Sequence, residues 1–319
     1  MFKKFCAVFI IFLMVFSLVD FGFSSENIMN SDDGTNTGVE SLAADNNLVP
    51  VTTQATSYSS HPVYDVISGY QYNFNPNIIH ATGCTAVIIN ARCSGLTDNR
   101  INEFKNAGLK VYLYCPSFFN PDTGNWDYST PDSLNHAKAR VSPFIDRVKG
   151  NSNIDGIILD YIRTSGTYPD PKYKNLICDL IAFSRDRLGN DKSLSAFIMP
   201  EMNGAATYGQ DIDLMKSYLN EIILMSYKGN YQQNSDWIRN IMDYFQSKVE
   251  GSNCKASAII QSYRSDSDLT LLPTNELYSD MDQVIKGGGY GTGLFRAGLN
   301  TLSTSNPYTP YTELNDVRF

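Results

Sequence analysis

The chain after residue 60 alternates between short, continuous apolar runs and longer stretches with helical periodicity. The runs occupy residues 63–68, 85–90, 110–115, 155–162, 194–199, 221–227, 255–263 and 290–296. Because each run is apolar throughout, and not only at every second residue, we expect strands that are buried on both faces, as in a parallel sheet covered by helices. Helical patterns lie between consecutive runs, so the sequence predicts repeated βαβ units.

Eight such units in about 260 residues match the size of a (β/α)8 TIM barrel. The alternative is a doubly wound open sheet, which often carries a glycine-rich phosphate loop after its first strand. The segment after run 63–68 begins Gly69-Tyr-Gln-Tyr and is no such loop. A second glycine-rich segment, Gly287-Gly-Gly-Tyr-Gly, precedes the last run and opens no helix, so we interpret it as a turn.

The N-terminal part has the pattern of an exported protein. Lys3 and Lys4 precede an apolar run over residues 5–19, and small residues precede a cleavage point after Ser24. We therefore expect a signal peptide at 1–24 or an uncleaved anchor, a disordered polar linker at 25–60, and one barrel domain at 61–319. The predicted location is secreted, extracellular or associated with the cell wall.

Charge and rare residues exclude several classes of function. The net charge of −8 and the absence of a basic block argue against a nucleic-acid partner. The cysteines form no CxxC pair and no cluster with histidine, so we expect no metal and no cofactor. We expect a monomer whose partner is a polysaccharide, without stable membrane insertion unless the N-terminal segment is retained.

In a barrel of this kind the functional site lies at the C-terminal ends of the strands. No histidine follows any of the eight runs, which disfavours Ser-His-Asp, Cys-His and histidine-metal centres. Arginines at these ends can bind acidic sugars or pair with neighbouring carboxylates. Aromatic rings there can stack on sugar faces or pack in the core. The candidate substrate-binding residues are Arg92, Tyr114, Trp126, Arg163, Tyr227, Gln261, Tyr263 and Arg296.

Two carboxylates follow neighbouring runs, Asp160 after the fourth and Glu201 after the fifth. Glycoside hydrolysis needs such a pair, one group to protonate the leaving oxygen and one to attack the sugar or activate water. We assign Asp160 as nucleophile or electrostatic stabiliser and Glu201 as acid/base, against the alternative that Asp160 merely pairs with Arg163 or Arg92. Alternation along the strand places Asp155 on the other face, in a structural role.

The segment Asp155-Gly-Ile-Ile-Leu-Asp-Tyr-Ile-Arg163 resembles the DGIxLDYIR strand of secreted TIM-barrel glycoside hydrolases. More distantly, it is similar to family 18 chitinase-like barrels with their DGxDxDxE strand, and 222–227 resembles a later strand of that group. The resemblance implies a carbohydrate substrate and a catalytic Asp160. Ile158 and Ile162 stand where the family 18 pattern has acidic residues, so it does not imply the chitinase mechanism.

Three other carboxylates are reserves for the second role: Asp65 in the first run, and Asp122 and Asp127 in the long loop 117–130. Trp126 at the middle of this loop is either a sugar-stacking platform or an anchor on the barrel rim. Cys93 and Cys115 follow neighbouring runs, so a disulfide between them is a further hypothesis.

The sequence thus predicts a secreted glycosidase acting on a cell-wall or other extracellular polysaccharide. The alternative is a non-catalytic, lectin-like barrel that binds glycans, which the isoleucine at the family 18 catalytic position favours. A metal-dependent deacetylase or phosphodiesterase is a third class, and the scarcity of histidine argues against it.

Overall fold

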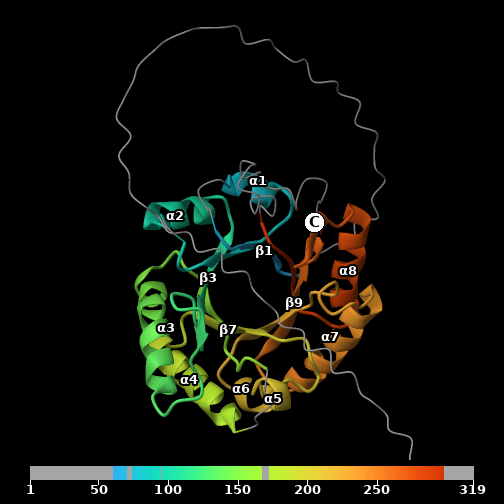
Figure 1. Cartoon of the computed structure of the whole chain (residues 1–319). Helices are drawn as coiled ribbons and strands as arrows, with labels where there is room; N and C mark the ends of the chain where they lie inside the picture. Colours follow the sequence, from blue (N-terminus) through green and yellow to red (C-terminus); the bar gives the residue numbers. More distant parts are fainter. Residues whose placement is uncertain (1–59, 70–73, 94, 167–171, 298–319) are drawn as a thin grey trace, which may run out of the picture. The chain divides into compact units, whose positions relative to one another are not determined.

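The eight apolar runs form the eight strands of a closed parallel barrel in the computed structural model, which describes residues 60–69, 74–93, 95–166 and 172–297 (Figure 1). The order around the barrel is β1-β12-β9-β8-β7-β6-β3-β2. The chain is therefore a (β/α)8 TIM barrel, as predicted. The strands are β1 Val63–Ile67, β2 Ala86–Asn90, β3 Lys110–Pro116, β6 Gly156–Asp160, β7 Ser193–Ile198, β8 Glu221–Met225, β9 Lys255–Gln261 and β12 Thr292–Phe295.

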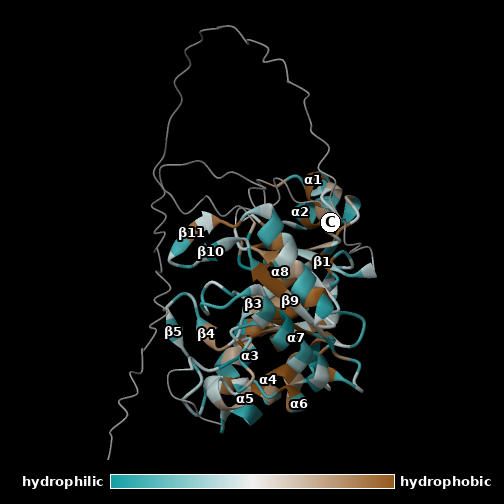
Figure 2. Ribbon diagram, turned by 90° about the vertical axis from the view of Figure 1, so that its right-hand side faces the viewer, coloured by the Kyte–Doolittle hydropathy of each residue, from teal (hydrophilic) through white to brown (hydrophobic). Residues whose placement is uncertain are grey.

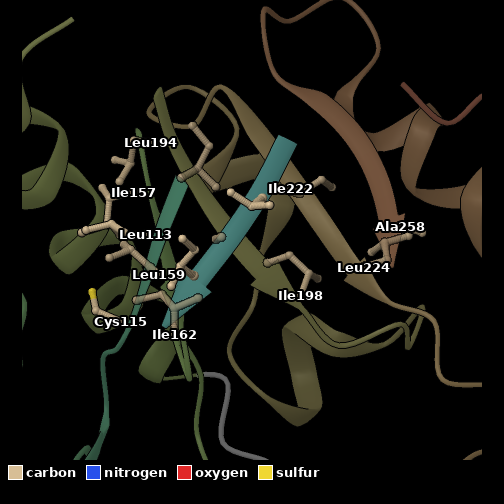
Figure 3. Packing of buried hydrophobic residues seen from close by; sticks show 14 of the residues in the cluster. Leu113, Cys115, Ile157, Leu159, Ile162, Leu194, Ile198, Ile222, Leu224 and Ala258 are labelled. Atoms are coloured by element: carbon tan, nitrogen blue, oxygen red, sulfur yellow. The ribbon is translucent and has the colours of Figure 1, made fainter. Parts of the chain in front are cut away.

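The strands bury both faces, which explains their uninterrupted apolar sequence. One set of side chains, including Ile88, Ile158 and Ile223, fills the barrel interior. The alternate set, including Leu113, Leu159 and Leu224, packs under the helices (Figure 3). On β6 this alternation directs Ile158, and with it Asp160, into the barrel.

Helices surround the barrel in Figure 1 and connect consecutive strands. Asn234 caps α7, because its side-chain oxygen accepts a hydrogen bond from the Trp237 amide. Asparagine is one of the residues preferred at this position. The segment between β7 and β8 contains only short helices, and α6 is a single turn that ends at Met215. The helices are α1 Pro76–Ala81, α2 Asp98–Asn106, α3 Ser133–Gly150, α4 Tyr173–Leu188, α5 Gly204–Thr207, α6 Ile212–Met215, α7 Ser235–Val249 and α8 Thr274–Lys286.

Two small hairpins follow the C-terminal ends of β3 and β9. The long loop predicted after the third run contains β4 (Phe119–Asn120) and β5 (Asn125–Trp126). The seventh run is interrupted after Gln261, so that β10 (Tyr263–Ser265) pairs with β11 (Asp268–Leu271). Figure 2 shows both hairpins on the same side of the barrel. They therefore add side chains to the end where the predicted site lies.

The predicted signal segment at 1–24 and the linker at 25–60 lie outside the described residues, apart from Ser60. Among the helices of the described ranges, none has the length and apolar character needed to cross a membrane.

Candidate functional site

Asp160 is the last residue of β6 and faces the barrel interior at its C-terminal end. The side chain follows Ile158 on the inner face, and its Oδ1 accepts a hydrogen bond of 2.7 Å from the Tyr161 amide. Burial raises the pKa of Asp160 to about 6, although this hydrogen bond and the charge of Arg163 act in the opposite direction. A carboxyl group with this pKa can carry or release a proton near neutral pH.

Tyrosines surround Asp160. The carboxylate charge helps to raise the pKa of Tyr114, Tyr161 and Tyr227, and burial is the larger cause for all three. Tyr227 stacks on Phe295 with ring centroids 5.2 Å apart, and Tyr114 contacts Phe197 edge-on at 5.8 Å. Two of the sequence-predicted substrate residues, Tyr114 and Tyr227, are thus placed beside Asp160.

The alternative that Asp160 is one half of an ion pair does not hold. Within the described ranges, no arginine or lysine nitrogen lies within 4.0 Å of the Asp160 carboxylate. Arg92 instead pairs with Asp122 in the loop after β3. Arg163 is close enough for its charge to act on Asp160, but its guanidinium lies among aromatic rings. Asp160 is therefore held by a backbone amide and keeps an oxygen for other contacts.

Trp126 has the anchoring position, one of the two roles that the sequence left open. It is half-buried and contacts Phe119 at 5.5 Å and Tyr161 at 5.7 Å between ring centroids, which anchors the hairpin to the barrel rim. The same indole lies over the Arg163 guanidinium at 4.7 Å. Trp126 thus joins a charged residue of the site to the hairpin.

Glu201 lies three residues beyond the end of β7, at the same end of the barrel as Asp160. Its Oε1 accepts hydrogen bonds from the hydroxyls of Tyr208 at 2.6 Å and Tyr231 at 3.3 Å. Tyr208 also lies against the guanidinium of Arg163. Two tyrosines therefore orient the Glu201 carboxylate. Arg163 contacts one of them, Tyr208, and its charge also acts on Asp160.

The three reserve carboxylates have structural positions. Asp65 is fully buried on β1, on the outer face that it shares with Val63 and Ile67, so it points away from the barrel interior. Asp122 is the exposed partner of Arg92. Asp127 accepts from Arg140 at 3.2 Å and from His136 at 3.0 Å, contacts that fasten the loop to α3.

Sequence reasoning missed Asp266, which lies between β10 and β11. Its carboxylate accepts hydrogen bonds from Asn230 at 2.8 Å, Tyr263 at 3.0 Å and Gln261 at 3.2 Å. Its charge raises the pKa of Tyr161 and Tyr227, the same rings that Asp160 influences. Donors from β9, β10 and the segment after β8 converge on it only after folding. One sequence signal was available, its place just beyond the seventh run.

Gln261 and Arg296 complete the predicted residues. The Oε1 atom of Gln261 is enclosed and has no hydrogen-bond partner among the described residues, while its Nε2 donates to Asp266. Arg296 is half-buried beside Phe295, and its charge acts to lower the pKa of Tyr114 and Tyr263. Both side chains therefore offer polar groups at the strand ends.

The hypothesised disulfide is absent, since Cys93 and Cys115 are both free thiols. Cys115 points to the outer face of β3 and lies in the core under the helices, whereas Cys93 Sγ lies 3.7 Å from the Ser68 carbonyl oxygen. Within the described ranges, no group of three or more histidine, cysteine, aspartate or glutamate side chains is placed to hold a metal ion.

A hollow of about 510 Å³ lies elsewhere, lined by α1 and α2 residues that include Asn75, Arg100 and Glu103. It contains neither of the predicted catalytic carboxylates. We place the site at the strand ends because Asp160, Glu201 and the arginines gather there.

The barrel is similar in fold to several solved structures of glycoside hydrolases. It is similar to the glycoside hydrolase domain of PgaB (BpsB) from Bordetella bronchiseptica, at 12% identity, with a TM-score of 0.57 and coverage of 76% of this chain and 96% of that one. A chitinase from Chromobacterium violaceum gives 14% identity, a TM-score of 0.58 and coverage of 75% and 95%. The spore cortex-lytic enzyme SleL from Bacillus cereus gives 10%, 0.55, and coverage of 75% and 71%.

No family model and no curated protein matches the chain in sequence. At these identities the structural matches show the barrel fold, while the roles of the residues depend on the site itself.

Proposed function

We propose that the protein is a secreted glycoside hydrolase that cleaves a cell-wall or other extracellular polysaccharide. The observation that carries the proposal is Asp160, a carboxyl group at the C-terminal end of a barrel strand, with a pKa raised to about 6 and no cationic partner within the described ranges. The likeness to glycoside hydrolase barrels supports the same chemistry.

Asp160 acts as the general acid in this proposal. A group with a pKa near 6 is protonated often enough at mildly acidic pH to donate a proton to the leaving glycosidic oxygen. This reverses the roles assigned from the sequence, because strand position alone does not show which carboxyl is desolvated. Glu201, oriented by Tyr208 and Tyr231, is the second carboxylate, acting on the sugar or on water.

Substrate binding falls to the residues around this pair. Tyr114 and Tyr227 provide aromatic surface next to Asp160, and Gln261 helps to position Asp266 through the hydrogen bond from its Nε2. Arg296, whose charge acts on Tyr114 and Tyr263, and Arg92, which pairs with Asp122, are the remaining residues that contact sugar units in this proposal.

Release of reducing ends from a panel of cell-wall and storage polysaccharides tests the proposal. The wild-type protein is measured beside Asp160→Asn, Glu201→Gln and Asp266→Asn. We expect the first two to abolish release and Asp266→Asn to retain most of it. Loss with Asp266→Asn and retention with Glu201→Gln would transfer the second role to Asp266.

The lectin-like alternative has one specific observation in its favour, the isoleucine side chains at 158 and 162, which are both buried. Retention of one glycan on an affinity gel, without release from any substrate, would establish binding in place of hydrolysis.

A further inference from the structure

We propose that Arg163 is an anion-binding subsite at the C-terminal strand ends and that the glycan bound there carries carboxylate groups, as polymers of uronic acids do. The inference deepens the proposed function, because it names the class of glycan. Its test is a binding measurement, so it does not depend on hydrolysis.

Arg163 is a buried cation with few hydrogen-bond partners. Its side chain is 8% exposed, and the one acceptor that it contacts in the described ranges is the Thr164 carbonyl, 2.9 Å from Nη1. Within the described ranges, no carboxylate oxygen lies within 4.0 Å of the Arg163 guanidinium nitrogens. A guanidinium group has five N–H donors, and a buried charge is normally paired.

Arg185 shows how this fold satisfies an arginine that has a structural role. Its guanidinium donates to four acceptors, the carbonyl oxygens of Tyr218, Gly189 and Lys192 and the side chain of Asn220. Arg163, by contrast, donates to one acceptor among the described residues, the Thr164 carbonyl oxygen. None of its nitrogens is among the fully enclosed polar atoms without a partner, so its remaining donors reach accessible space.

Aromatic rings from three loops surround the Arg163 guanidinium. Its Cζ lies 4.7 Å from the ring centre of Trp126, 5.4 Å from that of Tyr208 and 5.9 Å from that of Tyr161. Cation–π contacts hold the charge in place without neutralising it. The site therefore has a fixed, desolvated positive charge beside rings that can contact a sugar.

The Arg163 guanidinium lies near the proposed reaction site. Arg163 follows Asp160 by three residues, and the charges of the two act on each other. A planar guanidinium matches a planar carboxylate through two parallel hydrogen bonds, whereas a neutral hydroxyl leaves the charge unbalanced. The net charge of −8 opposes general attraction of polyanions, so retention of an acidic glycan would reflect a local site.

Affinity electrophoresis with matched polymers tests this inference. The full chain is run through gels containing polygalacturonate, alginate or hyaluronan, and through gels containing the same polymers with their carboxylates methyl-esterified. We expect at least one acid form to bind about tenfold or more tightly than its ester. Arg163→Gln should remove this difference, and Arg163→Lys should retain part of it, because lysine keeps the charge but not the paired donors.

Arg187→Gln is the matched control, because it removes the same charge near the end of α4, where Arg187 pairs with Asp146 of α3. Thermal melts of each variant establish folding. Equal retention of acid and ester forms, no retention of any acid form, equal losses in both arginine variants, or stronger retention by dextran sulfate would each overturn the inference. Selective binding without cleavage would uphold it and count against the hydrolase.

Discussion

The two ends of the barrel each direct a buried carboxyl group inward, but they differ in how that group is bonded. At the N-terminal end, Glu221 accepts hydrogen bonds from the hydroxyls of Tyr64 and Ser257. At the C-terminal end, Asp160 accepts one from a backbone amide. Burial raises both pKa values, to about 7 for Glu221 and about 6 for Asp160. A raised pKa therefore does not by itself mark an active site.

The hydrogen-bond partners separate the two roles. The side chains around Glu221 belong to the barrel strands and satisfy both of its oxygens, which is typical of a structural network. Those around Asp160 extend into loops and hairpins that carry polar groups with remaining bonding capacity, such as Gln261. We expect function at the second end and stability at the first, as in TIM barrels generally.

The largest expected effect is on catalysis. Asp160→Asn removes the proposed proton donor and should lower kcat/KM for polysaccharide cleavage by about 10²- to 10⁴-fold. Its free energy of unfolding should change little at about pH 4, where Asp160 is protonated, since the hydrogen bond from the Tyr161 amide can be kept. Parallel activity assays and denaturant titrations check both parts. An inactive variant that is also strongly destabilised would contradict the contrast between the two ends.

Glu221→Ala should have the opposite profile. The change leaves the hydroxyls of Tyr64 and Ser257 without their acceptor and opens a cavity, which should lower the free energy of unfolding by about 2–4 kcal/mol. Urea denaturation measures the loss. Glu221→Gln is the matched control, which fills the space and retains an acceptor, and it should cost less. A drop in activity in the folded Glu221→Gln variant would count against a purely structural role.

Changes in pH should separate the two groups further. Both carboxyls have folded-state pKa values above their unfolded values, so the folded protein binds more protons and its stability falls as the pH rises from about 4 to 7. Glu221→Gln should flatten the upper part of this slope in denaturation experiments. Asp160 must be protonated to act as an acid, so kcat/KM should decrease above about pH 6. An activity that increases between pH 6 and 8 would overturn its role as acid.

The smallest expected effect concerns the rim. Arg92→Gln breaks an ion pair whose Asp122 side chain is 76% exposed, and such pairs contribute roughly 0–1 kcal/mol. The melting temperature should remain close to that of the wild type. If Arg92 binds outlying sugar units, KM should rise while kcat stays constant. A large loss of stability would show that the loop helps to hold the fold.

The predictions from the sequence agree with the structure for the barrel strands and differ from it for part of the site. The eight runs were predictable because burial on both faces requires an apolar side chain at nearly every position, and Asp160 was predictable because alternation fixes its face. The short α6 and the interruption after Gln261 were not predicted, because capping and hairpin pairing override the local apolar pattern. The proposed Cys93–Cys115 bridge failed because sequence proximity to a strand end does not fix the direction of a side chain.

The apolar runs and their alternation are enough to predict the barrel, its inward and outward faces, and the end at which charged residues gather. These features depend on periodicity, which is a local property of the chain. Folding is needed to establish which cations are paired and to bring Asp266 to the site. It also places Arg163 among Trp126, Tyr161 and Tyr208. Burial, electrostatic coupling and hydrogen-bond completion depend on groups brought together from distant segments, and no local pattern records them.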